Sequence, residues 1–141
     1  MGRWLPSDHF SRRFAVSVKG VCVINGKVIL LRTEQQEWDL PGGKLGWGES
    51  LETALQREVS EELGITVVVQ HIVAATRRRI RQSFPITVVV LIYRCHTLAT
   101  EADIQISSEH TAYGLFHPSE LTELHLPSGY LSAIHDCFAN D

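Results

Sequence analysis

The 141-residue sequence predicts an α/β protein in which helices cover both faces of one mixed central sheet, an α/β/α sandwich. Two observations lead to this class. Segments rich in β-branched residues lie before and after one strongly periodic helical segment, and a second amphipathic segment closes the chain. The length suits one compact domain over residues 1–141, and the sequence contains no internal repeat, low-complexity tract or linker.

The first two strands are predicted to form a hairpin. Residues 14–24 (FAVSVKGVCVI) and 27–32 (KVILLR) are apolar runs with many β-formers. The Asn25-Gly26 pair between them favours the tight turn whose twist matches that of paired strands. Residues 37–40 are expected to form a short strand that leads into a glycine turn.

A helix is predicted over residues 51–63. Ser50 is a good N-cap, Glu52 places negative charge in the first turn, and Gly64 supplies a C-terminal stop. Apolar side chains recur at helical spacing and should lie on a core. They are Leu51, Ala54, Leu55, Val59 and Leu63.

The chain after this helix supplies the remaining elements. Residues 65–76 and 85–96 are rich in β-branched side chains and are predicted to form two longer strands. Residues 111–116 are expected to add a short strand, 118–121 a helical turn, and 128–138 a closing amphipathic helix.

Composition indicates a protein of the cytoplasm. The hydrophobic content of 44% and charged content of 21% are ordinary for a globular domain, and the net charge of −3 gives no reason to expect nucleic acid as a partner. No apolar run is long enough to span a membrane, and the N-terminus lacks a signal-peptide core. Cys22, Cys95 and Cys137 are widely spaced in apolar surroundings, which is typical of buried thiols in a reducing compartment.

The most informative feature is the acidic character of the predicted helix. Glu58, Glu61 and Glu62 are spaced i, i+3, i+4, so they share one side of a helix, where like charges repel. A divalent cation among them would remove the repulsion, because Mg²⁺ and similar ions prefer carboxylate oxygens. Glu58 and Glu62 also project into the apolar stripe, and partly buried carboxylates need a partner or a metal.

The turn before the helix, residues 40–44 (LPGGK), is the second part of the pattern. Gly42 and Gly43 allow the backbone to come close to a ligand and to expose its N–H and C=O groups. Such a turn is weak evidence by itself, since most glycine pairs only reverse the chain. At a fixed spacing from the acidic helix it becomes part of one candidate site.

Together these residues resemble the full Nudix box. The matching positions are Gly43, Glu49, Arg57-Glu58-Val59, Glu61-Glu62 and Gly64-Ile65, with five residues between the first two and seven before the arginine. The pattern fixes many positions, and the elements around it also resemble the family. The resemblance implies the Nudix fold and Mg²⁺- or Mn²⁺-dependent hydrolysis of a nucleoside diphosphate linked to another group.

The resemblance also assigns roles to individual residues. It implies that Glu58, Glu61 and Glu62 bind metal together with the Gly42 carbonyl, and that Arg57 holds the acidic side chains in place. Glu49 matches an acid that supports this network and sometimes binds metal, and Glu109 resembles a later glutamate near the metals. The general base is expected to be Glu58 or Glu62 rather than Glu61, although in some members it lies on a later loop.

Several residues are candidates for substrate binding. They are Gly43 and Lys44 of the glycine turn, Trp47, which glycines flank on both sides, and Arg78 and Arg79. The two arginines belong to a basic cluster with Arg77 and Arg81, placed between the two long strands. This cluster is either a solvated hairpin end or a clamp for substrate phosphates, which arginine binds with two parallel hydrogen bonds.

Other aromatic and histidine side chains are given structural roles. Trp38 is expected to pack, and His110 to be a surface or packing residue rather than a ligand. Gly46 stands where many Nudix enzymes carry an acidic residue, which indicates altered contacts of the glycine loop.

Three classes of function remain. The first is a MutT-like pyrophosphohydrolase of (deoxy)nucleoside triphosphates, oxidised nucleotides included, with ADP-ribose or a nucleotide sugar as the alternative substrate. The second is a catalytically silent Nudix nucleotide-binding or sensor module, against which the intact acid set argues. The third is an isoprenoid diphosphate isomerase, whose cysteine motif the chain lacks. The expected partner is a nucleotide-type small molecule, and a homodimer is compatible with the resemblance because many family members are dimers.

Overall fold

The protein, described here by a computed structural model over residues 14–80 and 86–139, has one seven-stranded mixed sheet. Its elements are β1 (Phe14–Ile24), β2 (Lys27–Arg32), β3 (Trp38–Asp39), β4 (Gly42–Lys44), α2 (Leu51–Leu63), β5 (Val68–Ile80), β6 (Ile86–His96), the 3-10 helix η1 (Glu101–Asp103), β7 (Ala112–Phe116), the 3-10 helix η2 (Pro118–Glu123) and α3 (Tyr130–Ala139). The strand order is β3-β2-β1-β6-β5, with β4 also paired to β1 and β7 to β2. Only β1 and β6 are parallel; the other pairs are antiparallel.

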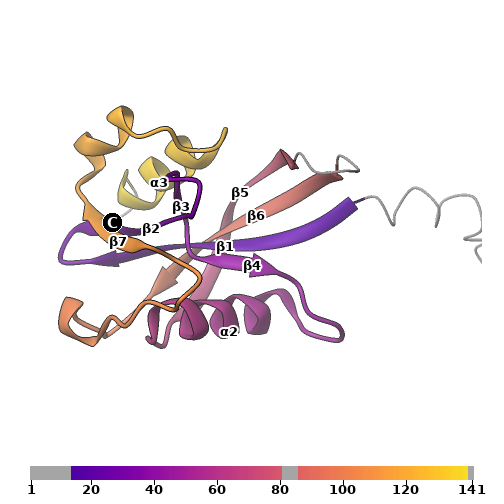
Figure 1. Ribbon diagram of the computed structural model, residues 1–141, viewed down its shortest axis with the longest axis horizontal. Coiled ribbons are helices and arrows are strands. Elements are labelled where there is room, and N and C mark those ends of the chain that lie inside the picture. Colours follow the sequence, from indigo (N-terminus) through magenta and orange to yellow (C-terminus); the bar gives the residue numbers. More distant parts are fainter. Residues whose placement is uncertain (1–13, 81–85, 140–141) are drawn as a thin grey trace, which may run out of the picture.

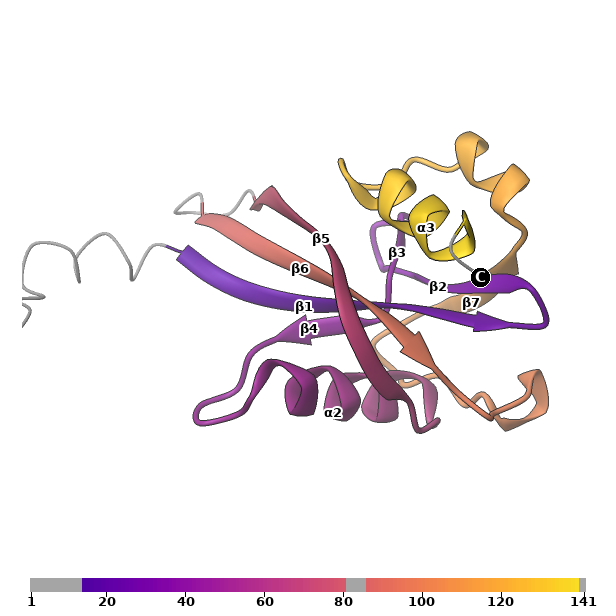
Figure 2. The same ribbon diagram turned by 180° about the vertical axis from the view of Figure 1, so that it is seen from behind.

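Helices cover the two faces of this sheet, as predicted. Helix α2 lies along one face, and α3 with η2 lies over the other (Figures 1 and 2). The core is divided accordingly: Leu55 and Val59 of α2 belong to one buried cluster, and Tyr130 and Ile134 of α3 belong to the other. The α/β/α sandwich is therefore confirmed.

The hairpin and the central helix form where the sequence predicted them. Asn25 and Gly26 both have positive φ values, 52° and 73°, as the tight hairpin turn requires. The Ser50 hydroxyl accepts the Thr53 N–H at 3.1 Å and caps α2, and Gly64, in the left-handed conformation at φ 69°, ends it.

The glycine turn differs from the prediction, because residues Gly42–Lys44 form strand β4. This strand pairs with β1 through Ser17↔Lys44, Val18↔Gly43 and Lys19↔Gly42. Gly42 has φ 139°, and a Cβ there would overlap the Val18 carbonyl oxygen. Only glycine lets β4 lie this close to β1, so a residue pair that indicated a turn forms a strand here.

The strand after α2 also differs from the prediction. It was expected over residues 65–76, but β5 begins at Val68 and continues to Ile80, so Arg77–Arg79 lie within the strand. Antiparallel pairing with β6 continues as far as Ile80↔Ile86, and this pairing outweighs the polar composition of the arginine run. Arg81 lies outside the described residues.

Smaller differences concern element ends. Strand β3 spans two residues rather than four, and α3 starts at Tyr130 rather than at residue 128. Gly129 has φ 86°, which is incompatible with a right-handed helix and delays the start. The three cysteines are buried and free, as expected. Among the described residues, no helix has the length and apolar character needed to cross a membrane.

Candidate active site

Glu62 is the buried carboxylate of the acidic helix. Its residue is 6% exposed, and its Oε1 accepts the Gly42 N–H at 2.7 Å, which ties α2 to β4. Its Oε2 lies 3.4 Å from His110 Nε2. Burial raises the pKa of Glu62 to about 7, while the Gly42 N–H and the charge of Lys19 act in the opposite direction. The expectation that this position projects into the core is confirmed.

Arg57 gathers three other acids around one guanidinium group. Its Nε and Nη2 donate to Glu49 at 2.7 and 2.9 Å, and its Nη1 donates to Glu58 at 3.1 Å and to Glu61 at 3.3 Å. Its Nη2 also donates to the Lys44 carbonyl at 3.3 Å. The guanidinium lowers the pKa of Glu49, and Glu49 and Glu58 raise the pKa of Arg57. Arg57 therefore lies where a residue that positions these carboxylates would have to lie.

Glu58 and Glu61 differ in their surroundings. The Glu58 carboxylate lies directly against Gly43, where a Cβ would be 2.6 Å from Glu58 Cδ. The second glycine of β4 is thus the surface on which this carboxylate rests. The Glu61 side chain is 59% exposed, although its carboxylate contacts Arg57. Of the three acids, one is buried, one lies on the glycine strand and one is at the rim.

These side chains have the chemistry of a site for a hard divalent ion. Carboxylate and carbonyl oxygens are the ligands that Mg²⁺ and Mn²⁺ prefer, and a cation beside Glu62 would offset the cost of its buried charge. Within the described part of the chain, however, no three acidic, histidine or cysteine side chains converge closely enough to hold a metal as they stand. Glu58 and Glu61 each place one carboxylate oxygen next to Arg57 Nη1.

A second charged cluster was not predicted from the sequence. Lys19 Nζ lies 3.2 Å from Asp39 Oδ2 and donates to the carbonyls of Leu40 and Gly42 at 3.1 and 3.4 Å. Arg78 Nη1 lies 3.2 Å from the same Asp39 oxygen. One sequence signal was available: Lys19 is the single charged residue of an apolar strand, and a buried lysine needs a partner.

Tyr130 of α3 lies beside this second cluster. Burial and the charge of Asp39 raise the pKa of its hydroxyl. The Tyr130 hydroxyl is buried and lies close enough to Asp39 and Arg78 to interact with both side chains.

Arg78 and Arg79 point to opposite faces of β5, because side chains alternate along a strand. Arg78 is half-buried next to Asp39. Arg79 is exposed and lines a cavity of about 320 Å³ with Arg77 and Thr87. The expected location of these arginines, in a connection between two strands, is wrong.

The remaining candidates lie at or near the surface. Trp47 is fully exposed, and Lys44 is exposed. Glu109 is exposed, whereas its neighbour His110 is largely buried. His110 was expected to be a surface or packing residue. No feature of the neighbouring sequence predicted that its ring would lie next to Glu62.

Two other positions have packing and loop roles. Trp38 packs edge-to-face on Phe116, with ring centroids 4.9 Å apart, as expected. The Gly46 N–H donates to Glu49 at 2.7 Å, and a Cβ at Gly46 would overlap the Glu49 carboxylate. The glycine that replaces the common acid therefore makes room for Glu49 beside Arg57.

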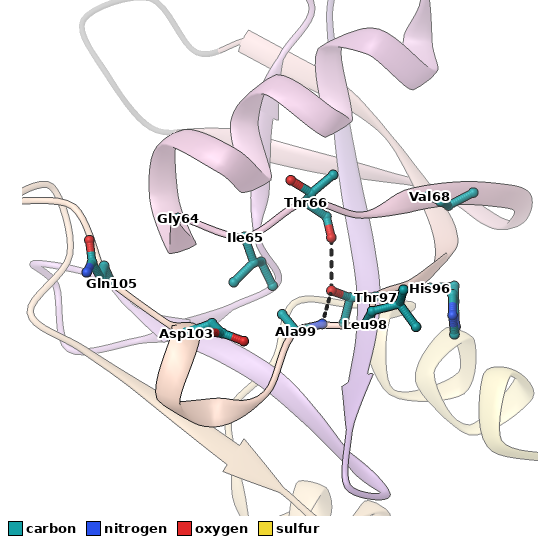
Figure 3. Close-up of a pocket in the computed structure, with 10 residues that line it drawn as sticks. All are labelled: Gly64, Ile65, Thr66, Val68, His96, Thr97, Leu98, Ala99, Asp103 and Gln105. Carbon is teal, nitrogen blue, oxygen red and sulfur yellow. Dashed lines mark hydrogen bonds between the residues drawn. The ribbon is translucent and has the colours of Figure 1, made fainter.

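A cavity of about 560 Å³ lies at the C-terminal end of α2 (Figure 3). It is bordered by the segment after α2 and the loop after β6, which Thr97 Oγ1 joins through a hydrogen bond to the Thr66 carbonyl. Asp103 is its acidic lining residue, and none of the acids of α2 lines it. The cavity is therefore separate from the candidate active site.

Comparison with known proteins decides the family. The family model of the NUDIX domain matches residues 12–136. The chain belongs to the Nudix family. A MutT-like protein from Streptomyces ambofaciens is 35% identical over 111 residues, which cover 77% of this Nudix chain and 68% of that relative.

Two further Nudix proteins show the range of the similarity. The nucleoside triphosphatase NudI from Salmonella typhimurium is 34% identical over 93 residues, which cover 60% of this chain and 64% of that protein. The crystal structure of a MutT protein from Methanosarcina mazei Go1 aligns with a TM-score of 0.73 at 26% identity, over 90% of this chain and 94% of that chain. As a Nudix protein of this kind, the chain is a hydrolase that acts on pyrophosphate bonds.

Proposed function

We propose that this Nudix hydrolase is a Mg²⁺- or Mn²⁺-dependent pyrophosphohydrolase of nucleotide-type small molecules. Its proposed substrates are (deoxy)nucleoside triphosphates, oxidised forms included. The observation that carries the proposal is the contact between the buried Glu62 carboxylate and the Gly42 N–H, beside the acids held by Arg57. The MutT-like relative and the nucleoside triphosphatase NudI support this choice of substrate class.

The proposed chemistry assigns one task to each group of residues. Glu58, Glu61, Glu62 and the Gly42 carbonyl would hold the divalent ion, which when bound neutralises the diphosphate and lowers the pKa of its water. Arg57 keeps the acids in position through its paired contacts with Glu49 and its contact with Glu58. Glu58 or Glu62 is the proposed base that accepts the proton of the attacking water.

The second charged cluster is the proposed contact for the rest of the substrate. It is connected to the acids by short contacts, from Arg78 to Asp39, from Asp39 to Lys19, and from Lys19 to the Gly42 carbonyl. Its cations, Lys19 and Arg78, suit a phosphate group of the substrate. We place Trp47, Lys44 and Arg79 at the periphery of the substrate site.

A panel of substrates tests the proposal. The protein would be incubated with Mg²⁺ or Mn²⁺ and nucleoside triphosphates, ADP-ribose, nucleotide sugars and dinucleoside polyphosphates, and the released phosphate species would be measured. We expect the largest kcat/KM for a nucleoside triphosphate. Preference for ADP-ribose or a nucleotide sugar would replace the substrate class and keep the reaction. Tight nucleotide binding without turnover would indicate a silent binding module.

Cellular context and assembly complete the proposal. Free, buried cysteines suit a reducing compartment, so we place the protein in the cytoplasm. A homodimer stays a prediction, which light scattering of the purified chain would test.

A further inference from the structure

The loop between η1 and β7 is fastened to the end of α2. The Gln105 N–H donates to the Leu63 carbonyl at 2.8 Å, and the Ser107 N–H donates to the Glu62 carbonyl at 3.1 Å. The His110 N–H then donates to the Ser107 carbonyl at 3.3 Å and closes a turn. These bonds satisfy carbonyls that a helix end leaves without partners, and they hold the loop at the residue that carries the buried carboxylate.

The His110 ring lies on the Glu62 carboxylate. Its side chain is 12% exposed, and its Nε2 is 3.4 Å from Glu62 Oε2. Its Nδ1 is buried and makes no hydrogen bond within the described ranges of the chain. In the tautomer that carries the proton on Nε2, this nitrogen is a donor beside the Glu62 carboxylate, at a separation slightly longer than an ordinary N–H···O bond. Hydrogen bonds of active sites are often long in the free enzyme and shorten when substrate is bound.

Two contacts from different parts of the chain therefore define where the Glu62 side chain lies. Gly42 of β4 contacts Oε1, and His110 of the later loop contacts Oε2. A carboxylate with one contact can rotate about its last bond, whereas one with a contact on each oxygen is restricted to a single orientation. Residues that orient ligands in this way typically change metal affinity or activity about 10- to 100-fold when they are replaced.

We propose that His110 is a positioning residue that fixes the Glu62 carboxylate through its Nε2–H. The inference rests on the proposed function, in which Glu62 holds the divalent ion. It assigns no proton transfer to His110, and it gives the exposed Glu109 no part in the contact. A ring that only filled space would tolerate replacement by an apolar side chain of similar size.

Three variants test this inference. His110→Leu retains volume but removes the N–H donor, whereas His110→Gln retains a side-chain N–H donor that reaches about as far as Nε2. His71→Gln is the matched control, because His71 is exposed on β5. Each metal-free protein would be titrated with Mn²⁺ while free Mn²⁺ is followed by electron paramagnetic resonance. kcat and KM would then be measured with the best nucleotide, and the thermal midpoint with and without EDTA.

We expect His110→Leu to lose about 10- to 100-fold in Mn²⁺ affinity and in kcat, with KM changed much less. His110→Gln should regain most of that loss, and His71→Gln should match the wild type. A His110→Leu protein with wild-type Mn²⁺ affinity and kcat would overturn the inference. So would equal losses in His110→Leu and His110→Gln, since those would show that ring packing alone matters.

One more variant distinguishes an error in the proposed function from an error in the inference about His110. Glu62→Gln is measured in the same series. If Glu62→Gln keeps full Mn²⁺ affinity and turnover, the role of Glu62 itself is wrong, and the inference about His110 is overturned with it. If Glu62→Gln is inactive while His110→Leu behaves as the wild type, the proposed function stands and only the inference about His110 is overturned.

Discussion

Two requirements on the Glu62 carboxyl group oppose each other: burial favours its protonated form, whereas metal binding needs its ionised form. Its position on α2 places it in the apolar core, where burial raises the pKa of the carboxyl group to about 7. A carboxylate that holds a divalent ion has to be ionised. The Gly42 N–H and the nearby charge of Lys19 both favour the ionised form, so the fold already offsets part of the cost of burial.

Replacing Glu62 by glutamine is expected to abolish metal-dependent turnover, with a loss of at least about 100-fold in kcat. The amide retains the shape of the side chain and an oxygen acceptor for the Gly42 N–H, so the fold should stay intact. Steady-state kinetics with Mg²⁺ and circular dichroism would measure the two effects. Full activity in Glu62→Gln would remove this residue from the proposed site.

The raised pKa of Glu62 also predicts how stability depends on pH in the metal-free protein. The folded-state pKa of about 7 is higher than the ordinary value of 4.5, so the folded state binds this proton more tightly than the unfolded state. This contribution is complete below about pH 4.5 and is lost as pH rises through 7. The loss is on the order of 3 kcal/mol, since each pKa unit corresponds to about 1.4 kcal/mol.

Urea unfolding in EDTA at pH 5 and pH 8 would measure this dependence. Other groups titrate in both proteins, so the difference between wild type and Glu62→Gln isolates the carboxyl group. The wild type should lose more stability than the variant between the two values. The same pH dependence in both proteins would contradict the assignment.

The two arginines of β5 make separate predictions, because they lie on opposite faces of the strand. Removing Arg78 and Arg79 together should raise KM. We expect Arg78→Ala to account for most of a roughly 10-fold increase, since Arg78 lies beside Asp39 on the path to Gly42, and one charge-assisted hydrogen bond is worth about 1.5–3 kcal/mol. Arg79→Ala serves as the comparison. An unchanged KM in the double variant would exclude both arginines from the substrate contacts.

Strand β4 lies between β1 and the acidic helix α2 and contacts both. Gly42 and Gly43 are adjacent, yet each accommodates a different neighbour. A Cβ at Gly42 would meet the β1 backbone at Val18 and Lys19, whereas the atoms nearest to a Cβ at Gly43 would be those of the Glu58 carboxyl group. Backbone cannot move aside without loss of strand pairing, but the end of a glutamate side chain can.

Substitutions at the two glycines of β4 should therefore have different effects, one on stability and the other on activity. Gly42→Ala should lower the free energy of unfolding by more than about 2 kcal/mol, because it combines a positive φ with a backbone overlap. Gly43→Ala should leave stability nearly unchanged and lower kcat, because it displaces Glu58. Urea unfolding and kinetics on both variants would measure these effects. A fully active Gly43→Ala protein would show that the position of Glu58 against β4 does not matter.

An element could be predicted from the sequence when the interactions that stabilise it are local. The ends of α2 were predictable because Ser50 and Gly64 act within one turn of the helix. The extension of β5 through Arg77–Arg79 was not predictable, because it depends on pairing with β6. Strand β4 was missed for the same reason, since Gly42 lies against a strand more than twenty residues earlier.

In the whole molecule, the sheet connects the acids of α2 to the second charged cluster of Lys19, Asp39 and Arg78. Helix α2 brings its acids from one layer, while α3 covers the other face (Figure 2). Tyr130 of α3 interacts with Asp39 and Arg78. Lys19 links the two groups through Asp39 and the Gly42 carbonyl. A ligand that binds the acids should therefore stabilise the folded protein as a whole.

Adding Mg²⁺ or Mn²⁺ to the metal-free protein should raise its thermal midpoint. At a concentration 100-fold above Kd, a ligand that binds only the folded state adds about 2.7 kcal/mol. Differential scanning calorimetry with and without EDTA would measure the shift, with Glu62→Gln as the control that should respond less. An equal rise in both proteins would place the stabilising ion elsewhere.

Residue type and spacing in the sequence were enough to predict the family, the acidic helix and the glycines before it, because all three depend on one short segment. The sequence also predicted that Glu62 lies toward the core, because the helical repeat sets the direction of each side chain. Only the tertiary structure decided which groups meet there. Lys19, Asp39 and Arg78 come from three strands, and His110 comes from a loop nearly fifty residues after Glu62. Contacts between segments so distant in the chain depend on strand pairing and packing, which no local pattern encodes.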